Sequence, residues 1–344
     1  MTSKQEVNWH FVMIVLDTHL KQYSAGADVI ILLKRLAAME NRPNIVVDLL
    51  WDCEQFKNNS VIAHFDKETG LSYERIERTQ FHSKMIGEFT TKTTAAVQAK
   101  ISVFSIFCHG MGFYYRHDSR VFDVGNLFKD MTAKFDVIIL ESCYLATVEV
   151  VYELQDRCDY LLASEGSHNR LLSWKMELFD ENLTLQQFLE MFCQVGIEKN
   201  FAGEIGKIYK PVMDYSVINV SAFKQLWNWM KRNKMELRNV PMWAWKKYKI
   251  EGKLRHKYCP TYDLYGIATA AYSGDNLDTF KRLFEATVIA QCMTPLSKEL
   301  YRYKLYGLAW SPVPWDMNQG WSYKYLSIYP EAENVIMLPK DLIL

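Results

Sequence analysis

The sequence predicts an α/β fold in which helices flank a mostly parallel sheet, with a mainly helical C-terminal extension. Strand-like and helix-like segments alternate through the first two-thirds of the chain, which is the pattern of right-handed βαβ units. The strand-like run at 137–140 is apolar at every position, as expected for a sheet buried on both faces. Hydrophobic residues make up 49% of the 344 residues and charged residues 23%, which is typical of a globular protein.

The individual elements follow from short apolar runs and from the residues that bound them. Ser24 is a suitable N-cap for the first helix, and Pro43 follows the end of that helix. The turn-like residues 66–70 predict a hairpin between two of the strands. The expected strands cover residues 9–16, 44–50, 61–65, 71–76, 101–107, 136–140, 160–163 and 215–220. The expected helices cover residues 25–40, 94–100, 147–155 and 185–195.

The chain changes in character after about residue 221, where Trp, Tyr, Met and basic residues become dense. Here we expect helices at 222–234, 262–271 and 276–290, and short strands at 301–306 and 323–328. No low-complexity linker separates this part from the rest. We therefore predict a sheet domain over residues 1–225 and a helical extension over 226–344 that packs on it.

Composition and charge narrow the function classes. Forty basic residues balance forty acidic ones, which removes any global argument for nucleic acid or an anionic membrane as partner. No apolar run approaches the roughly 18 residues of a membrane span. The first residues lack the apolar stretch of a secretory signal, and seven scattered cysteines without a C-x-x-C motif are typical of reduced thiols. We therefore expect a cytoplasmic, reducing location.

Metal and cofactor chemistry find little support in the sequence. His256 and Cys259 lie three residues apart, but no pair has zinc-finger spacing, and a metal site there is disfavoured. No phosphate-binding loop or dinucleotide fingerprint is present. We expect neither a metal nor a cofactor.

Two apolar strands end in residues that can do chemistry. The strand at 103–107 leads to His109 and Gly110, and the strand at 137–140 leads to Cys143. If the strands are parallel neighbours, both side chains emerge at one edge of the sheet, where ligands of open α/β sheets bind. A cysteine becomes a nucleophile as its thiolate, which a neighbouring base promotes. A lone cysteine at a strand end is more often a small buried hydrophobic residue, but the paired strand ends favour the catalytic interpretation.

These residues carry a resemblance to the clostripain family of cysteine peptidases, within the caspase-like group. In that family a hydrophobic strand precedes His-Gly, and a second one precedes a short polar pair and the catalytic Cys. Residues 141–154, Glu-Ser-Cys-Tyr-Leu-Ala-Thr-Val-Glu-Val-Val-Tyr-Glu-Leu, are similar to the family's block around the Cys and its following helix. Residues 159–165, Asp-Tyr-Leu-Leu-Ala-Ser-Glu, are similar to its next strand. Weaker similarity lies at 9–17, 262–265 and 326–330.

The resemblance implies a role for each matching residue. It implies a caspase-like sheet, with His109 as the catalytic base and acid and Cys143 as the nucleophile. The amides of Gly110 and Cys143 would bind the oxyanion. Glu141 matches the acid that selects Arg or Lys, and a carboxylate suits a cationic side chain. The remaining residues that the resemblance places in the substrate-binding cleft are Ser142, Glu165 and Trp174.

Several of these positions depart from the family pattern or have a second interpretation. Glu141 replaces an Asp, Ser142 replaces an Ala, and the Gly that precedes Trp174 in the family is absent. Glu165 is equally well interpreted as a structural acid at a strand end. Arg116 and Arg120 lie in a polar segment between the two strand ends, where family members often cut themselves. The alternative is that this segment is a wall of the cleft and that the chain works uncut.

The sequence therefore predicts a cysteine endopeptidase that cleaves proteins or peptides after Arg or Lys through a His-Cys dyad. The alternative is a catalytically inactive relative that acts as a binding or structural protein through its basic C-terminal region. Residues 231–257 carry ten basic and two acidic residues, with Trp243, Trp245 and Tyr248 among them. This pattern suits nucleic acid or an anionic surface, although a solvated basic segment is the preferred interpretation.

Overall fold

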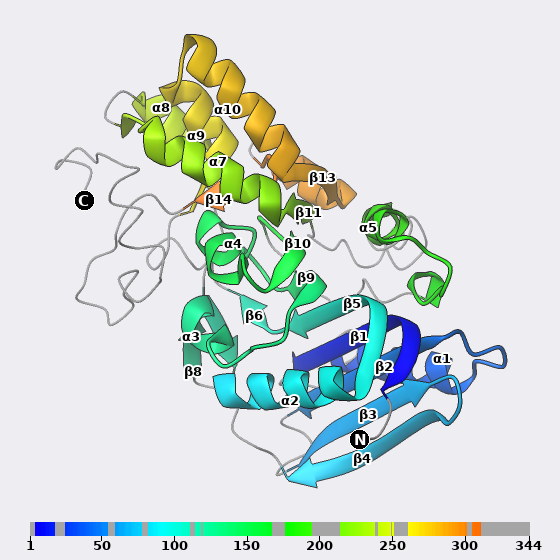
Figure 1. The fold of residues 1–344 in the computed structure, drawn as a ribbon. Helices are drawn as coiled ribbons and strands as arrows, with labels where there is room; N and C mark the ends of the chain where they lie inside the picture. The colour runs from blue at the N-terminus through cyan, green and yellow to red at the C-terminus, as the bar shows by residue number, and fades with distance from the viewer. Residues whose placement is uncertain are drawn as a thin grey trace.

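A computed structural model shows a central sheet with helices on both faces and a helical region at one side (Figure 1). The structure describes residues 4–17, 25–53, 59–77, 82–110, 114–117, 120–166, 176–194, 214–237, 240–248, 250, 261–300 and 305–310.

Nine strands form the main sheet in the order β13-β11-β10-β9-β5-β1-β2-β3-β4. The five central strands, β10 to β2 in that order, are parallel to one another, and the two outer strands at each side are antiparallel. The strands of this sheet are β1 (Gln5–Asp17), β2 (Ile45–Cys53), β3 (Asn59–Asp66), β4 (Gly70–Glu77), β5 (Val97–Phe107), β9 (Phe135–Glu141), β10 (Cys158–Ala163), β11 (Asp214–Asn219) and β13 (Val288–Met293). The predicted α/β class with a mostly parallel sheet is confirmed.

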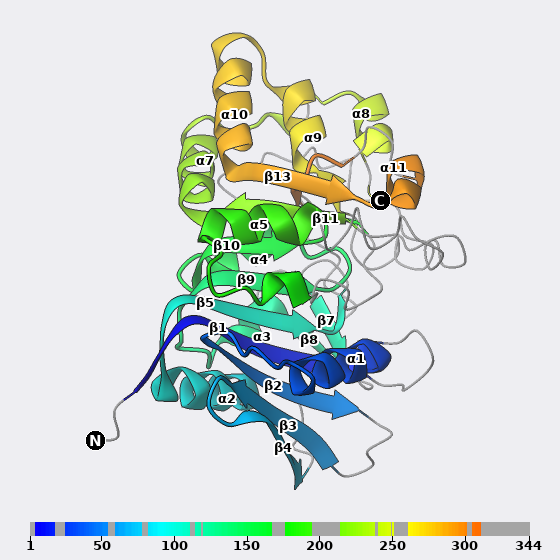
Figure 2. The ribbon, with the colours of Figure 1, turned by 90° about the vertical axis from the view of Figure 1, so that its right-hand side faces the viewer.

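Alternate residues of the central strands face two separate cores. In β1, Phe11 and Met13 pack on one face and Val12 and Ile14 on the other, so residues 11–16 of this strand are all apolar. The first face is covered by α1 (Ala25–Ala37), the 3₁₀ turn Met176–Leu178 and α5 (Leu185–Cys193). The second face is covered by α2 (Ser83–Ala96), α3 (Val124–Phe128), α4 (Val148–Leu154), α7 (Val220–Arg232), α8 (Met242–Tyr248), α9 (Leu264–Ala271) and α10 (Gly274–Thr287). Figure 2 looks onto the face that α1 and α5 cover, with the strands of the main sheet spread out behind them.

Two small sheets and a short helix lie outside the main sheet. β6 (His109–Gly110), β7 (Tyr114–His117) and β8 (Arg120–Asp123) form a three-stranded sheet, in the region that the sequence left as a polar segment. β12 (Tyr262–Asp263) pairs with β14 (Ala309–Trp310), and α11 (Pro295–Leu300) follows β13. The small sheets bring residues distant in sequence to the end of β9.

Two expected helices are wrong at their ends. The helix expected at 94–100 is the end of α2, which stops at Ala96, and Val97 already belongs to β5. The helix expected at 276–290 ends at Thr287, and residues 288–293 form the edge strand β13. In both cases a β-branched residue follows the helix and hydrogen bonds to a neighbouring strand prevail over local helix propensity.

The C-terminal third is mainly helical in its described residues, but it also supplies β13 to the main sheet. Residues 305–306 are described and are not a strand. The expected strand at 323–328, residues 301–304 and the expected N-cap Ser24 lie outside the described residues. The domain boundary at residues 225 and 226 stays a prediction.

Candidate active site

The two strands that carry His109 and Cys143 are parallel neighbours. β5 pairs with β9 in a register that sets Phe107 opposite Glu141. His109 and Cys143 therefore each follow two residues after the last pair, at the same edge of the sheet. The imidazole of His109 is exposed, and Cys143 is partly exposed.

Gly110 holds the histidine segment directly against the cysteine. A Cβ atom at residue 110 would lie 2.3 Å from the carbonyl oxygen of Cys143 and 3.0 Å from its amide nitrogen. Both contacts are with backbone, which cannot move aside as a flexible side chain can. Only glycine allows this approach, so the backbone of residue 110 lies beside the backbone of residue 143.

Ser142 ties the two strand ends together. Its Oγ donates to the carbonyl oxygen of Cys108 at 2.6 Å and accepts from the amide of Cys108 at 3.3 Å. The side chain is 1% exposed. Ser142 therefore joins the strand end before His109 to the strand end before Cys143, and the substrate contact that the resemblance implies for it stays a prediction.

Glu141 lies inside the sheet at the last paired position of β9. Its side chain is fully buried, and Oε1 accepts a hydrogen bond from Ser105 Oγ of β5 at 2.7 Å. The sequence predicts a carboxylate open to a substrate cation. The structure places this group beneath the edge, two residues before Cys143.

The residue after the cysteine has a backbone conformation that side chains seldom adopt. Tyr144 has a φ of 61°, in the left-handed region that costs a residue other than glycine about 1 kcal/mol or more. The amide of Tyr144 donates to the carbonyl oxygen of Gly166 at 2.8 Å, and the amide of Ala146 donates to that of Ser164 at 2.8 Å. Cys143 therefore directly precedes a sharp turn, and the segment after β10 stabilises this turn through two backbone hydrogen bonds.

A buried aspartate binds this supporting segment. Asp214, at the start of β11, accepts from Ser164 Oγ at 2.7 Å, from the amide of Glu165 at 2.8 Å and from the amide of Gly166 at 3.0 Å. Burial raises the pKa of Asp214 to about 6, although the three hydrogen bonds act to lower it.

The buried side chain of Glu165 contacts the C-terminal region. Its Oε2 accepts from the amide of Gly307 at 2.6 Å. Asp263 in turn accepts from the amides of Gly266 and Tyr306, the latter at 2.7 Å. Burial, and then the charge of Asp263 and a hydrogen bond with it, raise the pKa of Glu165 well above its usual range. Burial raises the pKa of Asp263 to about 7. These contacts agree with the structural acid at a strand end, and a substrate contact of Glu165 stays a prediction.

Residues of the C-terminal third also surround the cysteine turn, which the sequence did not indicate. Cys143 packs against a small apolar cluster that includes Tyr144, Ile250 and Leu305. The amide of Ala309 donates to the carbonyl oxygen of Ala146 at 2.8 Å. The site is therefore built from the sheet and from residues more than a hundred positions later in the chain.

The other predicted residues fall in different places. Trp174 lies outside the described residues, as do His256 and Cys259. Arg116 is opposite His109 in the β6–β7 ladder, and Arg120 begins β8.

In the basic region, α8 buries two of its three aromatic side chains. Trp245 is 7% exposed and Tyr248 8%, whereas Trp243 is 58% exposed. The buried pair serves the core, and binding of nucleic acid through residues 231–257 stays a prediction.

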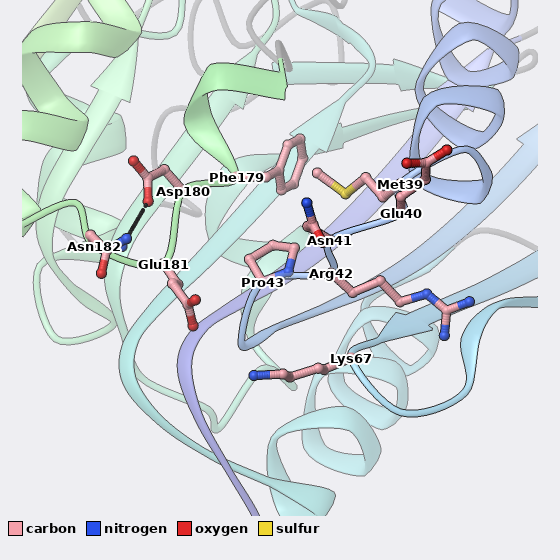
Figure 3. A pocket seen from close by; sticks show the side chains of 10 residues that line it. All are labelled: Met39, Glu40, Asn41, Arg42, Pro43, Lys67, Phe179, Asp180, Glu181 and Asn182. Atoms are coloured by element: carbon pink, nitrogen blue, oxygen red, sulfur yellow. Dashed lines mark hydrogen bonds between the residues drawn. The ribbon is translucent and has the colours of Figure 1, made fainter.

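A pocket of about 580 Å³ lies at the opposite edge of the sheet, near the amino end of β2 (Figure 3). It is lined by Met39, Glu40, Asn41, Arg42, Pro43, Lys67, Phe179, Asp180, Glu181 and Asn182. The lining mixes both signs of charge and contains none of the predicted catalytic residues. In the part of the chain that the structure describes, no helix is both long and apolar enough to cross a membrane.

Sequence reasoning missed the residues that hold the cysteine turn. Asp214 directly precedes an apolar strand and had no motif to distinguish it. Tyr144 is neither glycine nor asparagine, the residue types that usually indicate a left-handed turn. The signal for both is the three-dimensional neighbourhood of residues 164–166, which no local pattern contains.

Comparison with known proteins matches this region to a family. The model of the clostripain family matches residues 105–173, a range that contains both His109 and Cys143. A comparison with curated protein sequences finds no match.

Solved structures of proteases share the fold. A secreted C11 cysteine protease from Bacteroides thetaiotaomicron, in complex with an irreversible peptide inhibitor, has a TM-score of 0.69 at 14% identity, with 95% of this chain and 99% of that chain covered. An inactive zymogen C11 protease from Parabacteroides distasonis has a TM-score of 0.66 at 17% identity, with 96% and 99% covered. A second structure of a secreted Bacteroides thetaiotaomicron C11 protease, named iotapain, has a TM-score of 0.61 at 14% identity, with 89% and 93% covered.

These comparisons correct one expectation and confirm others. The expected cytoplasmic location is wrong, since two of the solved relatives are described as secreted. Scattered thiols were a poor guide, because buried cysteines such as Cys158 and Cys292 can stay unpaired in any compartment. The caspase-like fold class is confirmed, and a cysteine-type peptidase is supported. Residues 105–173 of this chain are therefore similar to the clostripain family of cysteine peptidases, and its fold is similar to that of solved C11 proteases.

Proposed function

We propose that this protein is a cysteine endopeptidase that cleaves after Arg or Lys, with His109 and Cys143 as its catalytic dyad. The equal spacing of the two residues beyond the last pair of β5 and β9 carries the proposal. A general base and a nucleophile on adjacent strand ends suit acyl transfer. The similarity in fold to a protease captured with an irreversible peptide inhibitor supports a peptide substrate.

The chemistry follows from this arrangement. His109 takes the proton of the Cys143 thiol, and the thiolate attacks the carbonyl carbon of the scissile bond. The amides of Gly110 and Cys143, whose backbones are in contact, donate to the developing oxyanion. The protonated His109 then gives its proton to the leaving amine, which leaves an acyl-enzyme. Water, deprotonated by His109, releases the acid and restores the thiol.

Glu141 is the proposed selector of the basic side chain. Glu141 lies two residues before the nucleophile, and its carboxylate is fully buried, where a charge-assisted contact with a substrate cation is strong. Ser105 Oγ holds one of its two oxygens, so the group is oriented before substrate arrives. The secreted relatives favour proteins or peptides outside the cell as substrates.

A thiol-reactive peptide probe with Arg at its reactive end tests the dyad. We expect the unmodified protein to be labelled at Cys143, the Cys143→Ala variant to be unlabelled, and His109→Ala to react at least a hundredfold more slowly, the usual scale for loss of a general base. Full labelling of His109→Ala would contradict the dyad. Absence of labelling in every variant would favour the inactive alternative, for which the zymogen from Parabacteroides distasonis is a precedent in the same fold.

Glu141→Gln tests specificity separately from the dyad. We expect KM for Arg and Lys peptides to rise about tenfold to hundredfold, because a contact worth about 1.5–3 kcal/mol is lost. Labelling of Cys143 by a small neutral alkylating agent should stay unchanged. Cleavage after Arg with an unaltered KM would contradict the pocket assignment alone.

Self-processing is the remaining question for this site. Cleavage after Arg116 or Arg120 would divide the β7–β8 hairpin, whose first strand pairs with His109. Intact mass of the purified protein and of Cys143→Ala decides this. Two fragments in the active protein alone would show self-cleavage, whereas identical single chains, with peptide cleavage retained, would show that the chain works uncut.

A further inference from the structure

The turn that carries Cys143 is supported by two layers of hydrogen bonds. In the first layer, the carbonyl oxygens of Ser164 and Gly166 accept from the amides of Ala146 and Tyr144, each at 2.8 Å. In the second layer, Asp214 accepts from the hydroxyl of Ser164 and from the amide of Gly166. The carbonyl oxygens of Ser164 and Gly166 thus bind the cysteine turn, whereas the Ser164 hydroxyl and the Gly166 amide bind Asp214.

Among the described residues, the side chain of Asp214 makes its hydrogen bonds to residues 164–166. Its side chain is fully buried at the first position of β11. Both carboxylate oxygens are used, Oδ1 by Ser164 Oγ and the amide of Gly166, and Oδ2 by the amide of Glu165. Three donors from three successive residues fix the orientation of the segment more firmly than any one bond could.

The left-handed Tyr144 explains why such support is needed. A residue with a side chain keeps a φ of 61° only where the surrounding structure imposes it. Released from Gly166 and Ser164, the turn would relax toward a common conformation and move Cys143 relative to His109. A displacement of about 1 Å can reduce turnover about a hundredfold.

We propose that Asp214 is a positioning residue that holds the nucleophile turn in its left-handed conformation through residues 164–166. The proposal rests on the function proposed above for Cys143. Asp214 contacts neither the thiol nor substrate in this role. It acts only through the backbone that binds Tyr144 and Ala146.

Asp214→Asn is the main test, because it keeps the shape of the side chain. One carboxylate oxygen becomes an NH₂ group, which is a donor. It then faces a backbone N–H whichever oxygen is replaced, that of Gly166 at Oδ1 or that of Glu165 at Oδ2. Asp136→Asn is the matched control. Asp136, at the amino end of β9, accepts from both the amide and the hydroxyl of Ser102, at 2.7 and 2.8 Å, but lies at the sheet edge remote from Cys143.

The first readout is hydrogen exchange at the amides of Tyr144 and Ala146, which does not depend on activity. We expect Asp214→Asn to lower protection there at least tenfold, and Asp136→Asn to leave it unchanged. The second readout is the reaction of Cys143 with iodoacetamide at neutral pH, followed on the peptide 135–157. We expect a severalfold slower reaction in Asp214→Asn only, as His109 no longer meets the thiol.

Kinetics then separate positioning from mere stability. With an Arg peptide we expect kcat to fall at least tenfold in Asp214→Asn, with KM within twofold, at a temperature where circular dichroism shows the variant folded. Unchanged exchange at Tyr144, or lower protection with unchanged kcat and alkylation, would overturn the proposal. Should Asp214→Asn fail to fold, Ser164→Ala, which loses one of the three donors, is judged by the same criteria with smaller effects. Absence of peptide cleavage in the unmodified protein would overturn the proposed function alone, since exchange and alkylation still report on the turn.

Discussion

Two buried polar clusters of this protein use opposite electrostatics. In the histidine cluster, Asp48 lies between His10 and His64, with Oδ2 2.8 Å from His10 Nε2 and Oδ1 2.8 Å from His64 Nδ1, and His64 reaches Asp66 at 3.0 Å. In the carboxyl cluster, Glu165, Asp214 and Asp263 are three acids that accept no hydrogen bond from a basic side chain of the described residues, and backbone amides supply most of their donors.

The pKa values reflect the difference. Burial alone would raise the pKa of Asp48, but hydrogen bonds from His10 and His64 outweigh burial and lower it. In the carboxyl cluster burial prevails, and the pKa values of Asp214 and Asp263 rise to about 6 and about 7. The hydrogen bonds of Asp48 to two imidazoles join strands, and removal of one partner from such a buried pair is destabilising. Acids that are buried close to one another instead favour their protonated forms. The first cluster joins β1, β2 and β3, and the second supports the cysteine turn.

Asp48→Ala should give the largest change in stability. It leaves His10, which is 2% exposed, without its carboxylate, and loss of one partner of a buried pair costs about 3 kcal/mol or more. We expect the free energy of unfolding in urea to fall by that amount, with kcat unchanged below the unfolding transition. A loss of activity in the folded variant would mean that the two clusters are not independent.

Gly110→Ala should have the converse effect, with a large loss of activity. The added Cβ would collide with the backbone of Cys143, and we expect kcat to fall at least a hundredfold, about 2.7 kcal/mol. Gly87→Ala is the control, because its Cβ would meet the backbone oxygen of Asp130 at 2.4 Å, away from the site. That variant should lose stability and keep its kcat, and an equal loss of kcat in both would contradict a local effect.

The pH dependence of stability should separate the clusters. The folded acids keep protons that the unfolded chain loses, so their stability contribution is present below about pH 4 and declines as pH rises through their folded pKa values. His64, whose pKa is raised by the hydrogen bond to Asp48, adds a decline above about pH 6.5. We expect the free energy of unfolding to fall from about pH 5 to about pH 8. Glu165→Gln has no titrating carboxyl at this position, so it should reduce the decline in stability that the acids cause. His64→Ala should reduce the decline above about pH 6.5. A profile that rises with pH would show that burial does not control the carboxyl cluster.

Ser142→Ala should have the smallest effect. It removes the hydroxyl that joins β5 and β9 at Cys108, and a neutral hydrogen bond contributes about 1 kcal/mol. We expect that loss in urea unfolding and a reduction of kcat of no more than a few fold. A larger fall in substrate affinity would support the substrate contact that the resemblance implies for Ser142.

The sequence was sufficient to predict the elements that are periodic or continuously apolar. Strands such as β9 and the positions of His109 and Cys143 at strand ends follow from local pattern, and the structure places both residues at one edge. The helix ends at Ala96 and Thr287 could not be predicted from the local pattern. The residues that follow them continue a helical pattern in sequence but form strands of the main sheet. The position of Glu165 could be stated only as two alternatives, since its partners Gly307 and Asp263 are about a hundred residues or more away.

The sequence by itself therefore determined the fold class and the pair of residues proposed for catalysis, because hydrophobic periodicity and short motifs are local properties of the chain. Tertiary structure alone decided how the pair is held. The pair is held by contacts between segments that are distant in sequence: the hydrogen bonds of Asp214, the left-handed turn at Tyr144 and the hydrogen bond of Ser142 to Cys108. The physical reason is that burial and hydrogen-bond geometry depend on which distant residues meet, and the energy of each such contact exists only once the sheet has formed.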